Sequence, residues 1–160
     1  MSTKFAYGEI TTKGIYKLNE WYFCGDKKVL DIGSGYGRLV RLLAEDNPEM
    51  ECVGIELDKT KHDISTEINK WSPARKRINY IHGDIFKNLH LLENADYIIA
   101  NILAWDNEDI LNLVKMISSM PDKLFIFNSH QCFSYETITL NVSWNSKPQP
   151  FYKLNTTIHG

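Results

Sequence analysis

The sequence predicts an α/β fold with a mostly parallel sheet and an antiparallel hairpin at its C-terminal edge. As far as residue 127, short apolar segments alternate with segments whose apolar residues recur at helical spacing, which is typical of parallel βαβ units. The rest of the sequence shows two segments of period-two alternation with no helix between them. A glycine-rich turn after the first apolar segment lies where such sheets bind ligands.

Helices are predicted where apolar residues lie three or four positions apart, and strands where short segments are rich in apolar and β-branched residues. The predicted helices are 11–23, 38–45, 59–71 and 107–119. The predicted strands are 28–32, 51–56, 78–82, 96–100 and 123–127, followed by an antiparallel pair at 135–144 and 151–158 with a proline-containing loop between them. In the third helix, Ile64, Ile68 and Trp71 follow one another at helical spacing.

The composition is that of an ordinary globular domain, with 43% hydrophobic and 12% aromatic residues. No apolar run reaches the roughly 18 residues that a membrane span needs, and the N-terminus lacks the apolar core of a signal peptide. We therefore expect an intracellular protein of the nucleus or cytoplasm with no membrane partner. Cys24, Cys52 and Cys132 are widely spaced, which predicts reduced thiols and no metal site. With a net charge of −2, any affinity for nucleic acid must come from a local patch.

The most informative segment is the turn after the first strand, where Gly33, Ser34 and Gly35 follow Asp31. Glycines let the backbone turn sharply and approach a ligand closely. A carboxylate just before the turn would repel the pyrophosphate of a dinucleotide, but it would attract the ammonium group of a methionine moiety. Arg38 also occupies the position where the dinucleotide fingerprint needs Gly or Ala. The turn therefore favours S-adenosylmethionine over a nicotinamide dinucleotide.

Two further acidic residues follow strands where other parts of that ligand would bind. Glu56 ends the second strand, about 20 residues after the turn, where a carboxylate accepts hydrogen bonds from both ribose hydroxyls. Asp84 follows the third strand and is predicted to accept from the adenine amino group, with Ile85 or Phe86 packed on the ring. The alternatives are a solvated strand end at Glu56 and a simple Gly-Asp turn at Asp84.

Taken in order, the segments 31–35 (DIGSG), 53–56 (VGIE) and 83–84 (GD) resemble the class I S-adenosylmethionine-dependent methyltransferases. More specific matches lie at the two ends. Tyr7-Gly8-Glu9 resembles the loop that closes over the cofactor in the Dot-type (disruptor of telomeric silencing) histone lysine methyltransferases, and residues 143–152 resemble that family's C-terminal hairpin.

The resemblance implies a Rossmann-like class I methyltransferase fold of the seven-stranded type in a single domain, residues 1–160. Within it, residues 1–25 would form the cofactor-closing loop and first helix, 26–130 the cofactor-binding core and 131–160 the C-terminal hairpin. No further domain or linker is expected.

The resemblance also implies a protein-lysine methyltransferase that acts on a core-histone lysine outside the tails, with a histone or nucleosome as partner. Tyr7, Glu9 and Asn101 would contact the cofactor, and Asn101 would also lie beside the reacting atoms. Four aromatic residues would wall a narrow channel for the lysine amine, whose charge aromatic faces stabilise: Trp105, Trp144, Phe151 and Tyr152. The alternatives are core positions for the aromatic residues and a helix-capping role for Asn101.

A basic cluster follows the third helix and is formed by Lys70, Arg75, Lys76 and Arg77. It is either a solvated helix end or a contact for nucleic acid or for the acidic surface of a nucleosome. Two other functions remain open on the same scaffold. One is an RNA or small-molecule methyltransferase, and the other is an inactive cofactor-binding subunit.

Overall fold

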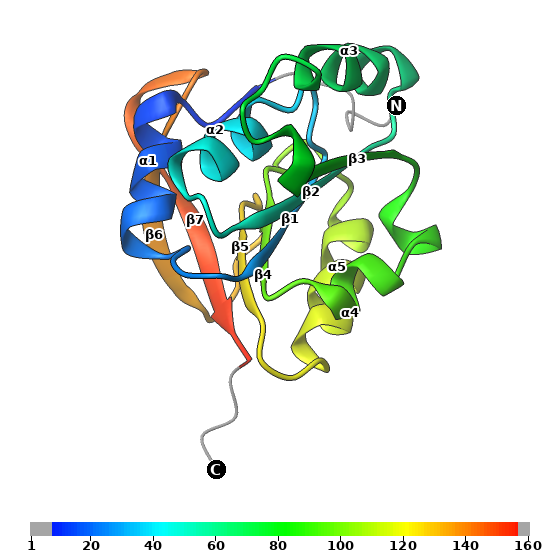
Figure 1. Ribbon diagram of the computed structural model, residues 1–160. Helices are drawn as coiled ribbons and strands as arrows, with labels where there is room; N and C mark the ends of the chain where they lie inside the picture. The colour runs from blue at the N-terminus through cyan, green and yellow to red at the C-terminus, as the bar shows by residue number, and fades with distance from the viewer. Residues whose placement is uncertain (1–7, 157–160) are drawn as a thin grey trace.

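A computed structural model describes residues 8–156 (Figure 1). Its helices are α1 (Thr12–Trp21), α2 (Arg38–Asp46), α3 (Lys59–Asn69), α4 (His90–Asn94) and α5 (Asn107–Ser118), with two 3-10 turns, η1 (Arg75–Arg77) and η2 (Ile85–Lys87). Its strands are β1 (Lys28–Ile32), β2 (Glu51–Glu56), β3 (Ile78–His82), β4 (Tyr97–Ala100), β5 (Leu124–Phe127), β6 (Glu136–Val142) and β7 (Asn145–Asn155). The sequence pattern does not predict α4, because its five residues are too few to show a helical period.

Within residues 8–156, seven strands form one mixed sheet in the order β3-β2-β1-β4-β5-β7-β6. Strands β1 to β5 run parallel, and β7 is antiparallel to both β5 and β6. The predicted mostly parallel sheet with an antiparallel edge is therefore confirmed. The strand order reverses between β1 and β4, and ligands bind in such sheets at the carboxyl ends of the strands beside that reversal.

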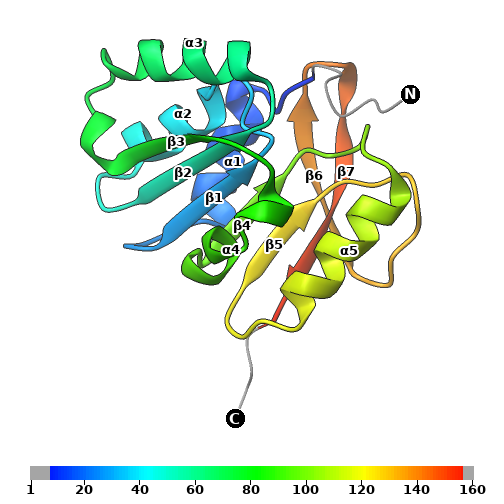
Figure 2. The same ribbon diagram turned by 90° about the vertical axis from the view of Figure 1, so that its right-hand side faces the viewer.

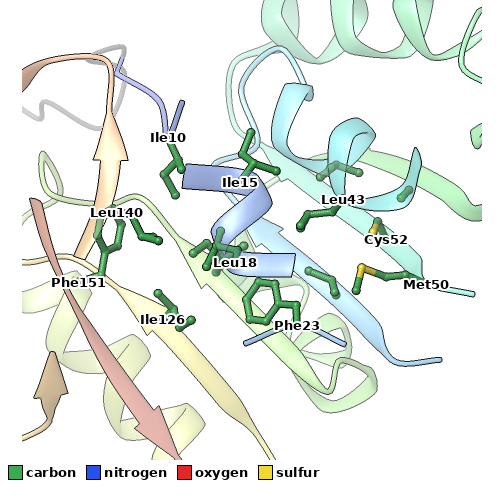
Figure 3. Packing of buried hydrophobic residues seen from close by; sticks show 14 of the residues in the cluster. Ile10, Ile15, Leu18, Phe23, Leu43, Met50, Cys52, Ile126, Leu140 and Phe151 are labelled. Carbon is green, nitrogen blue, oxygen red and sulfur yellow. The ribbon is translucent and has the colours of Figure 1, made fainter. Parts of the chain in front are cut away.

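Helices cover both faces of the sheet, with α1 and α2 on one face and α4 and α5 on the other (Figure 1 and Figure 2). Successive strand residues point to opposite faces, so each strand supplies side chains to two apolar clusters. In β1, Val29 packs in the cluster beneath α1 and α2, which also contains Leu18 (Figure 3). Leu30 packs in the cluster beneath α5, which also contains Leu113. Burial of both clusters holds the carboxyl ends of β1, β2 and β4 in place.

The C-terminal hairpin differs from the prediction in its turn. Ser143 and Trp144 alone join β6 to β7, so the prediction of a proline-containing loop is wrong. Pro148 and Pro150 lie inside β7 instead. Strand β7 pairs with β5 only from Tyr152 onward. On the β5 side, the two prolines therefore face no strand that would need a hydrogen bond from their backbone nitrogen, and they are tolerated there.

Among residues 8–156, every helix falls short of the length and apolar character that crossing a bilayer requires.

Candidate functional site

The glycine turn leads from β1 into α2 and leaves open space above it. Gly33, Gly35 and Gly37 have φ values of 77°, 57° and 80°, in the left-handed region that side chains disfavour. The backbone N–H groups of Gly33 and Ser34 donate to the carbonyl oxygen of Ile55 at 2.9 and 3.0 Å, which fixes the turn to β2. A Cβ atom added at Gly33 would meet no atom within 4 Å. The turn is therefore anchored from below and open on the side where a ligand would lie.

Glu56 closes one side of this space, and its carboxylate is held by the backbone. Its Oε1 accepts from the N–H of Gly35 at 2.7 Å, and its Oε2 accepts from the N–H of Asp58 at 2.9 Å. A carboxylate oxygen has more than one lone pair, so both atoms can still accept from a vicinal diol. The structure thus places Glu56 at the strand end with the fixed orientation that the predicted ribose contact needs.

Two buried polar groups lie beneath the turn. Asp31 is only 5% exposed, and burial, reinforced by the nearby negative charge of Glu56, raises the pKa of its carboxyl well above the usual range. The buried Oγ atom of Ser34 has no hydrogen-bond partner among the described residues. A cationic group beside Asp31 would stabilise its charged form, and a polar ligand group would satisfy Ser34. Both observations fit the ammonium-bearing end of a methionine moiety.

Tyr80 of β3 supports the turn from below, a role that the sequence pattern does not reveal. Its hydroxyl donates to the carbonyl oxygen of Gly37 at 2.8 Å. Burial raises the pKa of this hydroxyl, which therefore stays protonated as a donor. A Cβ atom at Gly37 would lie 2.5 Å from the Tyr80 oxygen, and one at Gly54 would lie 2.7 Å from the Cβ of Ser34. Both glycines are needed because side chains pack directly against their backbone.

The predicted site residues gather in two adjoining pockets. The larger brings together eight of them: Glu9, Asp31, Gly33, Ser34, Gly35, Glu56, Asn101 and Trp105. The smaller contains Asp84 and Ile85, and it shares Gly33, Glu56 and Trp105 with the larger. Asp84 caps η2 by accepting from the N–H of Phe86 at 2.9 Å, and the Phe86 ring centroid lies 6.3 Å from that of Trp105. Tyr7 lies outside the described residues.

Residues 8–11, here called the N-terminal cover, lie over the larger pocket and are held from two sides. Arg38, at the start of α2, donates to the carbonyl oxygen of Ile10 at 3.2 Å and to the hydroxyl of Thr12, and its guanidinium lies 3.7 Å from the carboxylate of Glu9. On the other side, the N–H of Glu9 donates to the Oγ of Ser143, whose own N–H donates to the Glu9 carbonyl oxygen at 2.8 Å. The sequence marks Arg38 only as a departure from the dinucleotide fingerprint, whereas its position allows it to bind the cover.

Asn101, after β4, is joined to the cover through a chain of amides. The backbone N–H of Ile102 donates to Oδ1 of Asn128 at 2.6 Å, and Nδ2 of Asn128 donates to Oδ1 of Asn101 at 2.6 Å. Nδ2 of Asn101 in turn donates to the carbonyl oxygen of Gly8 at 2.9 Å. A backbone donor at one end and a backbone acceptor at the other fix the orientation of both amides. Asn128 is 2% exposed, and no pattern in the sequence indicates its role.

The predicted aromatic channel is only partly present. Trp105 lines both pockets. Trp144 lies against the cover, because a Cβ atom at Gly8 would be 2.9 Å from Cε3 of its ring. The prediction for Phe151 is wrong: its side chain is 1% exposed and packs beneath α1 with Leu140 (Figure 3). The reason is that β7 lies within the sheet, between β5 and β6. Its successive side chains point to opposite faces, and Phe151 points to the face that α1 covers.

Tyr152, the neighbour of Phe151, points to the opposite face and also does not wall a channel. Its ring centroid lies 5.4 Å from that of Phe127 and 5.5 Å from that of Phe133, within the cluster beneath α5. The C-terminal hairpin therefore contributes a single aromatic residue, Trp144, to the neighbourhood of the pocket.

The basic cluster is also smaller than predicted. The guanidinium of Arg77 turns inward and donates to the carbonyl oxygens of Asn47 and Met50 at 2.9 and 2.8 Å, where it braces the connection between α2 and β2. The predicted nucleic-acid contact through Arg77 is thus replaced by a structural role. Lys70, Arg75 and Lys76 are exposed.

Comparison with known proteins gives a family match over most of the sheet. Residues 29–120 match the family model described as methyltransferase domain. The chain is 26% identical over 98 residues to strychnine O-methyltransferase of Strychnos nux-vomica. The matched segment covers 60% of this chain and 24% of that enzyme. It is 26% identical over 152 residues to malonyl-[acyl-carrier protein] O-methyltransferase of Priestia megaterium, which covers 88% of this chain and 54% of that enzyme. The chain thus spans about a quarter to a half of the length of these relatives.

Solved structures show the same architecture. An RNA methyltransferase from Salinibacter ruber, crystallised with S-adenosyl-L-homocysteine, matches with a TM-score of 0.75 at 16% identity and covers 94% of this chain and 95% of that one. Mitomycin 7-O-methyltransferase MmcR matches with a TM-score of 0.62 at 20% identity and covers 76% of this chain and 36% of that one. At such identities the likeness shows the fold. The comparisons support the class I methyltransferase fold, whereas the finer resemblance to Dot-type enzymes stays a prediction.

Proposed function

Because this chain belongs to the methyltransferase domain family, which its residues 29–120 match, we propose that it transfers the methyl group of S-adenosylmethionine to an RNA or small-molecule acceptor. One observation carries the proposal: the open turn at Gly33, the buried Asp31 and the backbone-held Glu56 line one pocket. An adjoining pocket at Asp84 continues it. The two pockets together suit a ligand with an ammonium group, a ribose and a flat ring.

Each part of the donor has a matching group. Asp31 and Ser34 suit the methionine end, because they supply a buried carboxylate and a buried hydroxyl that has no hydrogen-bond partner among residues 8–156. Glu56 suits the ribose hydroxyls. Asp84 and Ile85 suit the adenine, since a carboxylate accepts from its amino group and an apolar side chain packs on its ring. These roles are the ones that the sequence predicts for the same residues.

When bound, the donor supplies a methyl group on a positively charged sulfur, and S-adenosylhomocysteine is the product. The chain's own residues orient the acceptor and exclude water. Asn101 keeps one N–H and one lone pair beyond its bonds to Asn128 and Gly8, and these can hold an acceptor beside the pocket. Trp105 offers an aromatic face there, and the N-terminal cover shields the donor from solvent. Correct orientation supplies much of the rate in such a transfer.

The acceptor class follows from what lines the pockets. A lysine channel would need more aromatic walls, and Phe151 and Tyr152 are packed elsewhere. The relatives reinforce this choice, because strychnine O-methyltransferase is named for a small molecule and the Salinibacter ruber enzyme for RNA. We therefore favour RNA or a small molecule over a histone lysine.

The test combines donor binding with methyl transfer. Calorimetric titration with S-adenosylhomocysteine should show one site per chain. Incubation with methyl-labelled donor should then label total RNA or a small-molecule extract, and leave free histones and nucleosomes unlabelled. An absence of S-adenosylhomocysteine binding contradicts the proposed function as a whole. Labelled histones with unlabelled RNA and small molecules would restore the lysine prediction.

A further inference from the structure

Helix α3 exposes both of its apolar side chains, and a third exposed apolar residue, Trp71, follows just after its C-terminus. Ile64, Ile68 and Trp71 are 39%, 41% and 86% exposed, at positions i, i+4 and i+7. The buried residue of the helix is Ser65, at 1% exposure. Buried polar atoms of His62 and Asn69 have no hydrogen-bond partner among the described residues. On a surface helix the apolar side chains usually face the core. Packing within this chain therefore does not explain the exposure of Ile64, Ile68 and Trp71.

The segment that follows these exposed apolar residues is strongly basic. From Ile68 to Gly83 the sequence contains no Asp or Glu, although the whole chain has a net charge of −2. Arg75 and Lys76 are exposed, and neither forms an ion pair within the described residues. The positive charge beside Trp71 is therefore local and available to an anionic partner.

We propose that Ile68, Trp71, Arg75 and Lys76, here called the α3 patch, bind single-stranded RNA. An exposed indole next to cations matches the way proteins hold single strands, in which bases stack on aromatic rings and basic side chains contact phosphates. Duplex bases are stacked on one another and cannot use Trp71 in this way. The positive charge of the α3 patch is complementary to a polyanion such as RNA, and it would repel a basic histone.

The α3 patch is connected to the donor pocket by the helix itself. Asp58 caps α3 two residues after Glu56, and Lys61, one turn into the helix, lines the larger pocket. The helix of 11 residues is roughly 16 Å long, so the patch lies about one helix length from the pocket. An RNA strand held at the patch would present a nearby nucleotide to the pocket. The inference rests on the proposed function in treating this RNA as the methyl acceptor, whereas binding itself is tested separately.

The experiment measures binding of a short fluorescein-labelled single-stranded RNA by fluorescence anisotropy, beside titration with S-adenosylhomocysteine. Trp71→Ala should weaken RNA binding about 5- to 150-fold, the range typical of a lost base-stacking contact. Arg75→Ala with Lys76→Ala should lower the slope of log affinity against log salt by about 1.4, because each single-strand phosphate contact contributes about 0.7. Neither change should alter the affinity for S-adenosylhomocysteine.

Matched controls separate the patch from general effects of charge or aromatic content. Trp21→Ala removes another exposed tryptophan, on α1, and Lys13→Ala with Lys115→Ala removes two exposed lysines from other helices. Both control variants should bind RNA like the unaltered chain. Equal RNA binding by the patch and control variants, or no RNA binding at all, would overturn the proposal, and so would preference for an acidic peptide or a duplex. In each of these cases, retained S-adenosylhomocysteine binding leaves the proposed methyltransferase function standing.

Discussion

Replacing Asn128 by Leu should loosen the N-terminal cover, because it disrupts the attachment through Asn101 and leaves those to Arg38 and Ser143. Asn128 accepts from the buried N–H of Ile102 and donates to Asn101, which donates to Gly8. Leu has the same branched arrangement of side-chain heavy atoms but neither donor nor acceptor. The N–H of Ile102, a residue only 1% exposed, would lose its acceptor at a cost of about 1–3 kcal/mol, and the bond to Asn101 would add about 0.5–1.5 kcal/mol.

The expected loss of stability is thus about 2–4 kcal/mol, which corresponds to a fall in Tm of roughly 5–15 °C for a domain of this size. Asn128→Asp provides the matched comparison. Its carboxylate still accepts from Ile102, but it opposes the carbonyl oxygen of Asn101, whose amide must then rotate and turn that oxygen toward the carbonyl of Gly8. Asn128→Asp should therefore also release this attachment of the cover, and burial of its carboxylate at a position only 2% exposed adds a further cost in stability.

Thermal unfolding, hydrogen exchange and titration with S-adenosylhomocysteine distinguish these effects. Both variants should exchange the backbone amides of residues 9–11 faster than the unaltered chain and bind the product analogue more weakly. If Asn128→Asp shows unchanged exchange in residues 9–11 together with unchanged affinity, the amide chain does not hold the cover and the reasoning fails.

Three further outcomes are expected. Glu56→Ala should weaken S-adenosylhomocysteine binding at least tenfold in calorimetry, since two charge-assisted hydrogen bonds of about 1.5–3 kcal/mol each would be lost; an unchanged Kd would remove the ribose assignment. Phe151→Ala should destabilise the fold by about 3–5 kcal/mol in denaturant unfolding, as for a buried ring, and a purely catalytic loss at full stability would contradict its core position. The pKa of Asp31 is raised in the free protein, so its proton is lost at higher pH than in the unfolded chain, and its charged form destabilises the fold as pH rises. Affinity for the ammonium-bearing ligand should accordingly increase with pH as Asp31 ionises, and Asp31→Asn should flatten this dependence; a pH profile identical in both proteins would count against the assignment.

The sequence predicts the fold well where the local pattern of residues is enough to determine the position of an element. Strands β1 to β5 are short segments rich in apolar residues, and each consecutive pair except β3 and β4 is separated by a predicted helix, so their positions and their parallel direction can be predicted. The glycine turn and Glu56 are predictable for a related reason, since backbone conformation and spacing along the chain determine their roles. The hairpin turn at Ser143-Trp144 is missed because prolines usually mark loops, whereas here they lie in a strand that pairs with β6 and has no partner on the β5 side at those positions.

The remainder depends on contacts between segments far apart in the sequence. Asn128 meets Asn101 only because β5 pairs with β4, and Tyr80 reaches Gly37 only because β3 lies beside β2. Alternation shows that Phe151 and Tyr152 face opposite sides, but not that a helix covers one of them. The spacing of Ile64, Ile68 and Trp71 predicts a helix and leaves open which way its stripe faces. Such features can be known only once the positions of the helices and strands relative to one another are known.

The attachment of the cover to Ser143 has a consequence for the order in which the pocket is completed during synthesis. Glu9 and Ser143 are separated by 134 positions, so their hydrogen bonds close nearly the whole chain into a loop. The glycine turn, Glu56 and Asp84 all leave the ribosome well before β6 and β7. A nascent or C-terminally truncated chain would therefore possess the floor of the pocket, while its cover would lack the attachment to Ser143 and keep only those to Arg38 and Asn101. Full attachment of the cover is thereby tied to the synthesis of β6 and β7.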